Sequence, residues 1–172
     1  MIERAGGVTS KGKPLTVYGH QLKPGDAAPD FTLLGNDLNQ VSLKDFHGKI
    51  RVISVVTSLD TGLCDLQTRR FNEEAASLGE DVVILTVSAD LPFAQKRWCG
   101  AAGVERVITL SDHREMSFGN AFGTHIKELR LEQRAVLVVD GNGIVRYAQY
   151  VQENSEHPDY EAALSAVKEL TK

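Results

Sequence analysis

The hydrophobic and polar positions of the chain follow two different periods, and the order of these segments predicts a mixed α/β fold. Nearly continuous apolar and β-branched runs predict buried strands at 52–56, 81–88, 106–110 and 135–139. Apolar positions at helical spacing predict helices at 62–78, from Pro92 to about Cys99, at 117–122, and from about 158 to 170. Strands and helices in this order favour a mixed central sheet flanked by helices on both faces.

Antiparallel pairs complete the predicted fold. A glycine-containing turn at 11–14 predicts an added N-terminal β-hairpin over about 8–18. The turn at 140–143 is a strong hairpin signal, so residues 144–151 should return antiparallel to the strand before them. The resulting order of βαβ and then ββα is the layout of a thioredoxin-like fold. We expect residues 1–172 to form a single domain of this kind.

Charge and hydropathy narrow the range of partners. The formal net charge of −4 at pH 7 argues against nucleic acid or an anionic membrane as the main partner. No apolar run approaches the roughly 20 residues of a transmembrane helix. Residues 1–7 contain no apolar segment that resembles a signal peptide. These features predict a cytoplasmic protein.

The chain has two cysteines, Cys64 and Cys99, and their number restricts the chemistry that they can support. The five histidines show no ligand-type spacing and there is no Cys-x-x-Cys pair, so we expect no metal site. A permanent disulfide is disfavoured in a reducing cytoplasm, so a cysteine pair with a function would be catalytic or redox-sensing. The alternative is two unrelated buried thiols.

Cys64 occupies the most informative position in the sequence. The strand at 52–56 leads through Thr57 into a helix that begins between Thr61 and Leu63, so Cys64 falls in its first turn. Only the thiolate is a nucleophile, and helix N-termini stabilise thiolates. Thr61 could cap this helix or turn its hydroxyl toward the same site. The site would lie at the carboxyl end of a central strand, where open α/β sheets usually bind ligands.

Four segments of the chain together carry a family resemblance: Thr61-Gly62-Leu63-Cys64, Ser88 to Gly100, Arg134 to Asp140, and Pro158 to Ala163. The first is similar to the peroxidatic Thr-x-x-Cys motif of peroxiredoxins. The second resembles the resolving-cysteine segment of the bacterial thiol peroxidases, an atypical two-cysteine branch of that family. The third and fourth resemble its strand with the active-site arginine and its closing helix. The likeness extends from about Val8 to Leu170.

The resemblance implies a thiol-dependent peroxidase that reduces hydrogen peroxide and organic hydroperoxides in antioxidant defence. Cys64 would be the peroxidatic nucleophile that becomes a sulfenic acid, and Cys99 the resolving thiol that forms a disulfide with it. Thr61 would hydrogen-bond to the thiolate and the peroxide, while Arg134 would stabilise the thiolate and align the peroxide. The family also implies recycling by a thioredoxin-type reductant, a homodimer, and no cofactor or metal.

Each of these residues also has a simpler interpretation. Cys64 could be a small buried hydrophobe, Thr61 only a helix cap, and Cys99 an inert thiol. Arg134 could be a strand-start residue that pairs with a carboxylate at the surface. The chain departs from the family at Thr57, where peroxiredoxins usually carry a proline that shapes the cysteine pocket.

Two other functions fit the same residues. A thiol–disulfide oxidoreductase, or a relative of the bacterioferritin-comigratory type, would share the fold, although the lack of Cys-x-x-Cys argues against it. A redox-sensing switch or a holdase-type binding module would use the same disulfide without catalysis. A disulfide requires Cα atoms about 4.4–6.8 Å apart. Two thiols on separate helices therefore predict local unwinding around Cys64, Cys99 or both.

Overall fold

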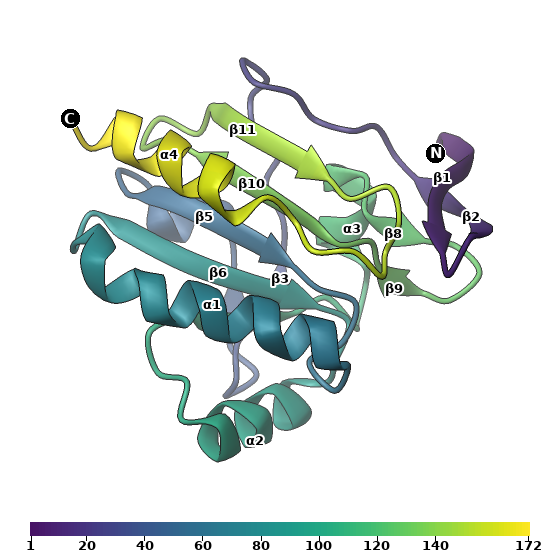
Figure 1. The fold of residues 1–172 in the computed structure, drawn as a ribbon, viewed down its shortest axis with the longest axis horizontal. Coiled ribbons are helices and arrows are strands. Elements are labelled where there is room, and N and C mark those ends of the chain that lie inside the picture. The colour runs from purple at the N-terminus through teal and green to yellow at the C-terminus, as the bar shows by residue number, and fades with distance from the viewer.

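Seven strands form the central sheet of the structure, a computed structural model that describes residues 1–172 (Figure 1). In spatial order they are β11 (Val145–Tyr150), β10 (Ala135–Val139), β5 (Ile50–Val55), β6 (Val82–Ser88), β7 (Ile108–Ser111), β3 (Leu33–Leu34) and β4 (Gln40–Val41). β5, β6 and β7 run parallel, whereas β10 lies antiparallel to β5. Every residue of β5 is buried, because layers cover both faces of this strand. The mixed sheet confirms the predicted thioredoxin-like layout.

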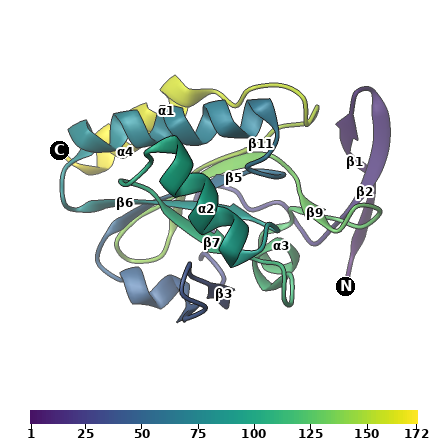
Figure 2. The same cartoon turned by 90° about the horizontal axis from the view of Figure 1, so that it is seen from below.

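Helices cover both faces of the sheet (Figure 2). They are α1 (Gly62–Leu78), α2 (Pro92–Ala102), α3 (Ser117–Phe122), α4 (Tyr160–Leu170) and the short 3₁₀ helix η1 (Leu43–Phe46). α1 and α4 lie side by side over an apolar cluster on one face, and α3 and η1 cover the other face. α2 packs beside β7. None of the helices combines the length and the hydropathy needed to cross a membrane.

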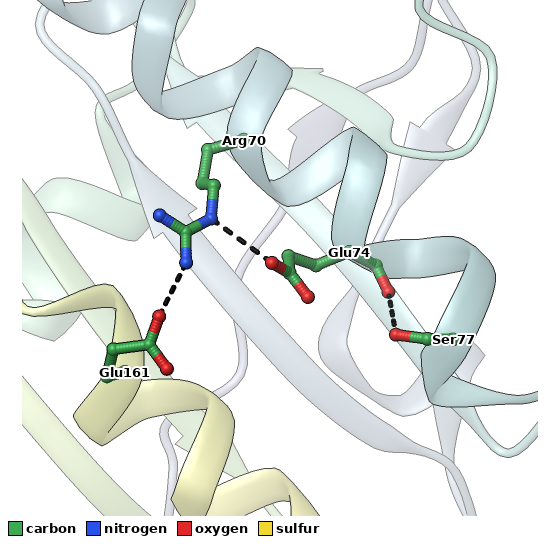
Figure 3. A network of polar contacts seen from close by, with 4 residues as sticks. All are labelled: Arg70, Glu74, Ser77 and Glu161. Atoms are coloured by element: carbon green, nitrogen blue, oxygen red, sulfur yellow. Dashed lines mark hydrogen bonds and ion pairs between the residues drawn. The ribbon is translucent and has the colours of Figure 1, made fainter.

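Charged side chains join α1 to α4 outside the sheet (Figure 3). Arg70 of α1 donates from Nη2 to Glu161 of α4 at 2.7 Å and from Nε to Glu74 at 3.2 Å. The Arg70 guanidinium also lies 5.0 Å from the centre of the Tyr160 ring. Exposed ion pairs contribute only about 0–1 kcal/mol each. These contacts link the middle of α1 to the first turn of α4.

A second sheet of four strands lies at the carboxyl end of the central strands (Figure 1). Its order is β1 (Glu3–Ser10), β2 (Lys13–Tyr18), β8 (His125–Ile126) and β9 (Leu131–Glu132). β1 and β2 confirm the predicted hairpin, although β1 begins at Glu3, earlier than expected. β8 and β9 were not predicted, because strands of two residues leave no alternating pattern in the sequence.

Two details of the helices differ from the sequence predictions. The helix expected to end near Cys99 continues to Ala102 and ends at Gly103, which adopts a left-handed φ of +68°. Leu66, expected on the apolar face of α1, is 56% exposed, whereas Gln67 and Thr68 are fully buried. Buried polar side chains need hydrogen-bond partners. The partners of Gln67 lead directly to the site.

Candidate active site

Cys64 lies in the first turn of α1, shortly after the carboxyl end of β5. Its side chain is fully buried and packs against Val56 and Leu59, with Trp98 of α2 beside them. The predicted position at a helix N-terminus is therefore the observed one. The surroundings of the thiol are more apolar and more closed than the sequence pattern suggested.

The loop before α1 is fixed by hydrogen bonds. Asp90, which follows β6, accepts from Ser58 Oγ at 2.7 Å and from Leu59 N at 2.8 Å. Thr61 is the N-cap residue of α1, but its side chain makes no capping hydrogen bond. The Thr61 hydroxyl donates instead to the Ser58 carbonyl at 3.0 Å. The loop thus sets the position of the first turn of α1.

Arg134 directly precedes β10 and is only 2% exposed. It donates from Nη1 to Gln67 Oε1 at 2.8 Å and from Nε to the Asn154 carbonyl at 3.1 Å. Its backbone N donates to Asn154 Oδ1 at 2.8 Å. No carboxylate pairs with the guanidinium, so the alternative of a surface ion pair is wrong. Nη2 makes no hydrogen bond within the protein.

A pocket of about 250 Å³ lies where these segments meet. It is lined by Ser10, Lys11, Thr57, Thr61, Leu63, Arg134, Asn154 and Ser155. Two predicted site residues, Thr61 and Arg134, therefore face the same space, together with the tip of the N-terminal hairpin. Cys64 does not line this pocket, and no hydrogen bond joins its sulfur to Thr61 or Arg134. The site contains no group of three or more His, Cys, Asp or Glu side chains able to hold a metal ion.

Tyr160 of α4 lies within electrostatic reach of the same groups. Burial raises the pKa of Tyr160, the positive charges of Arg134 and Arg70 oppose this effect, and Cys64 adds to it. A cation and a hydroxyl beside a thiol at a helix N-terminus can support nucleophilic attack on a polar bond in which negative charge develops.

Cys99 lies in α2, away from the pocket, and is partly exposed. Its Sγ is 3.7 Å from Thr109 Oγ1. Burial raises the pKa of the Cys99 thiol, and the hydrogen bond with Thr109 partly opposes that shift. Both cysteines are free thiols, so this structure contains no disulfide between Cys64 and Cys99. Their pairing stays a prediction.

Two residues that hold Arg134 were missed in the sequence. Gln67 carried a signal, since a polar residue three positions after Cys64 shares a helical face with it. Asn154 carried none, because it lies in the loop between β11 and α4 and contacts Arg134 only in the folded chain. Thr57 was noticed as a departure from the family, but its hydrogen bonds could not be foreseen.

Comparisons with known proteins show the family to which the chain belongs. The model of the redoxin family matches residues 23–164. The thiol peroxidase of Bacillus subtilis (strain 168) is 61% identical over 165 residues, which cover 96% of this chain and 98% of that protein. The thiol peroxidase of Staphylococcus aureus (strain MRSA252) is 55% identical over 163 residues, covering 95% and 98%. A peroxiredoxin-like protein from Aquifex aeolicus superimposes with a TM-score of 0.88 at 38% identity, covering 95% of this chain and 96% of its own.

The thioredoxin-like sheet and the match over residues 23–164 are those of a redoxin. The two thiol peroxidases narrow the assignment within that class. Each aligns with this chain over most of its length and is identical to it at more than half of the aligned residues. The chain belongs to the thiol peroxidase family of redoxins and is a peroxidase of the oxidoreductase class.

Proposed function

We propose that Cys64 of this thiol peroxidase reduces hydrogen peroxide and organic hydroperoxides, and that Cys99 then forms a disulfide with it. The observation that carries the proposal is the position of Cys64 in the first turn of α1, directly after Leu63, which lines a pocket together with Thr61 and Arg134. A thiolate, a hydroxyl and a fixed cation are the groups that cleavage of a peroxide bond requires.

The first step oxidises Cys64. Its thiolate attacks one oxygen of the hydroperoxide, the O–O bond breaks, and the other oxygen leaves as hydroxide or alkoxide and takes up a proton. The sulfur becomes a sulfenic acid, and the peroxide is reduced to water or an alcohol. Arg134 and the Thr61 hydroxyl stabilise the charge that builds up on the two oxygens.

The second step resolves the sulfenic acid. The Cys99 thiolate attacks the Cys64 sulfur, the S–O bond breaks, and hydroxide leaves as water. A dithiol protein of the thioredoxin type supplies two electrons by thiol–disulfide exchange and returns both cysteines to thiols. No metal or organic cofactor takes part in this scheme.

The second step also requires movement. Cys64 and Cys99 lie within two separate helices, whereas a disulfide needs Cα atoms about 4.4–6.8 Å apart. Unwinding of the first turn of α1 would bring the buried Cys64 sulfur out of its apolar contacts. We expect the unwinding to end before Arg70, because the contacts of Arg70 connect that part of α1 to α4.

The cellular setting belongs to the same proposal. The family resemblance supports a homodimer engaged in antioxidant defence, and the absence of a signal-peptide-like segment in residues 1–7 supports a cytoplasmic location. Sedimentation of the purified protein tests the first point, since a monomer at micromolar concentration would contradict it. Fractionation of cells that contain the protein tests the second.

The test of the chemistry is consumption of hydrogen peroxide and of an organic hydroperoxide with a dithiol reductant. We expect Cys64→Ser to abolish turnover and Cys99→Ser to allow one oxidation per protein before the rate falls. Full turnover by Cys64→Ser would overturn the proposal. A single stoichiometric oxidation of the unaltered protein, with no recycling by any dithiol, would favour the redox switch.

A further inference from the structure

Arg134 is held by a continuous set of buried and partly buried hydrogen bonds that begins next to Cys64 and ends at Thr57. The side chains involved are Gln67, Asn154 and Thr57, each from a different part of the chain. None of these residues was part of the proposed peroxidase chemistry. Their common feature is that each contact either binds Arg134 or fixes a group that binds it.

Gln67 fixes the guanidinium from the side of α1. Its Oε1 accepts from Arg134 Nη1 at 2.8 Å, while its Nε2 donates to Ser54 Oγ of β5 at 2.8 Å. Gln67 and Ser54 are both fully buried. The bond to Ser54 turns the amide so that its oxygen, and not its nitrogen, faces Arg134.

Asn154 fixes the other side of Arg134. Its backbone carbonyl accepts from Arg134 Nε at 3.1 Å, and its side-chain oxygen accepts from the backbone N of Arg134 at 2.8 Å. Asn154 lies in a loop, where a side chain held only by these contacts could rotate. The Asn154 amide nitrogen prevents this by donating to Thr57 Oγ1 at 2.7 Å.

Thr57 closes the set. Its hydroxyl accepts from Asn154 and donates to the Glu132 carbonyl of β9 at 3.0 Å. One hydroxyl thus joins three segments: the loop that leads to Cys64, the segment that leads to Arg134, and the loop that carries Asn154. Thr57 also lines the pocket, so the junction lies at its wall.

We propose that Thr57 is a positioning residue for the peroxidase, in that its hydroxyl orients Asn154 and thereby aims the free Nη2 of Arg134 at the site of peroxide cleavage. This inference rests on the proposed function of Cys64 and Arg134. An arginine side chain loses rotamer freedom when it is fixed. The hydrogen bonds around Arg134 fix the side chain during folding, before the substrate binds.

The test removes the hydroxyl without changing the shape of the side chain. In a Cys99→Ser background, which isolates the first oxidation step, we compare Thr57→Val and Thr57→Ser. We expect Thr57→Val to lower the rate constant of Cys64 with hydrogen peroxide by up to about tenfold, the scale of one lost hydrogen bond between neutral groups. Thr57→Ser should restore most of that loss. A matched control is Thr86→Val, because the Thr86 hydroxyl is buried in β6 and has no hydrogen-bond partner.

Asn154→Ala removes the side chain that connects Thr57 to Arg134, and this variant replaces Thr57→Val in the test if Thr57→Val does not fold. We expect a similar fall in the rate constant. The double variant Thr57→Val/Asn154→Ala should be no slower than the slower single variant, because both substitutions break one set of contacts. Additive losses would overturn the proposal, and so would a Thr57→Val rate equal to that of the control.

A crystal structure of Thr57→Val separates this inference from the proposed function, because it reports the position of Arg134 without any peroxide chemistry. In this variant the Arg134 guanidinium should leave its contacts with the Asn154 carbonyl and Gln67 Oε1. If the unaltered protein consumes no hydroperoxide, the peroxidase proposal fails while this structure still tests Thr57. An Arg134 side chain in the same place in Thr57→Val would refute the positioning role.

Discussion

Arg134 donates from Nη1 to the side-chain oxygen of Gln67 at 2.8 Å, and Gln67 lies one turn of α1 beyond Cys64. The helix that presents the reactive thiol therefore also holds the cation that is proposed to act on its substrate. A shift of α1 would move both groups together. This coupling makes Gln67 the clearest target for mutation outside the motif.

Gln67→Leu should lower both stability and activity. The substitution leaves the buried Nη1 donor of Arg134 without a partner, which costs about 1–3 kcal/mol in the free energy of unfolding. A displaced guanidinium should also lower kcat/KM for hydroperoxide by about 10- to 100-fold. Urea denaturation and peroxide turnover measure the two effects.

Gln67→Glu is the matched control for that experiment. It keeps an oxygen opposite Arg134 and so should retain most of the stability, but its negative charge compensates the cation and should still slow peroxide reduction. If Gln67→Leu and Gln67→Glu were both as active as the unaltered protein, Gln67 would have no role in orienting Arg134.

The rate of disulfide formation should rise with pH above neutrality. Burial raises the pKa of Cys99, and only its thiolate attacks the sulfenic acid, so little of the reactive form is present at pH 7. Thr109→Val removes a hydrogen bond that opposes this shift, so it should slow the step further at a given pH. Trp98, the single tryptophan, adjoins Cys99 and packs near Cys64, so its fluorescence can follow the step in a stopped-flow instrument. A pH-independent rate would contradict this expectation.

Oxidation should unwind the first turn of α1, the last turns of α2, or both. Hydrogen exchange of the reduced and the disulfide forms measures this directly, because amides lose protection where helical hydrogen bonds open. We expect faster exchange near Cys64 and Cys99 in the oxidised form, and unchanged exchange around Arg70, where α1 is bound to α4. Equal protection in both forms would show that the cysteines meet by another movement.

Glu132 should make the protein less stable as the pH rises. Its carboxyl group is completely buried, and burial followed by the nearby carboxylate of Asp112 raises its pKa well above the usual range. The folded chain therefore keeps a proton that the unfolded chain releases above a pH of about 4.3. The folded state binds more protons, so the free energy of unfolding declines as the pH rises from that value through the raised pKa.

Glu132→Gln removes this ionisation while keeping the shape of the side chain. The variant should be more stable than the unaltered protein at pH 8, and its stability should depend less on pH between 5 and 9. Urea denaturation across that range, with both proteins in the same buffers, supplies the measurement. Parallel stability curves for the two proteins would show that Glu132 does not titrate in this interval.

Much of the fold follows from local patterns. α1 and α3 have the predicted limits, and β10 is the predicted strand 135–139, because long periodic runs and strong turn signals leave few alternatives. The face of α1 was predicted less well. Leu66 is exposed and Gln67 is buried, since burial depends on the partners that β5 and Arg134 offer and not on hydropathy alone.

The sequence alone determined the parts of the site that are local. A thiol within one turn of a helix start, after a buried strand, follows from the spacing of Thr61 and Cys64 and from the apolar run before them. Tertiary structure decided the rest. It placed Asn154 and Thr57 around Arg134, and it enclosed the Cys64 side chain, because such contacts join segments up to about a hundred positions apart that meet only when the sheet forms.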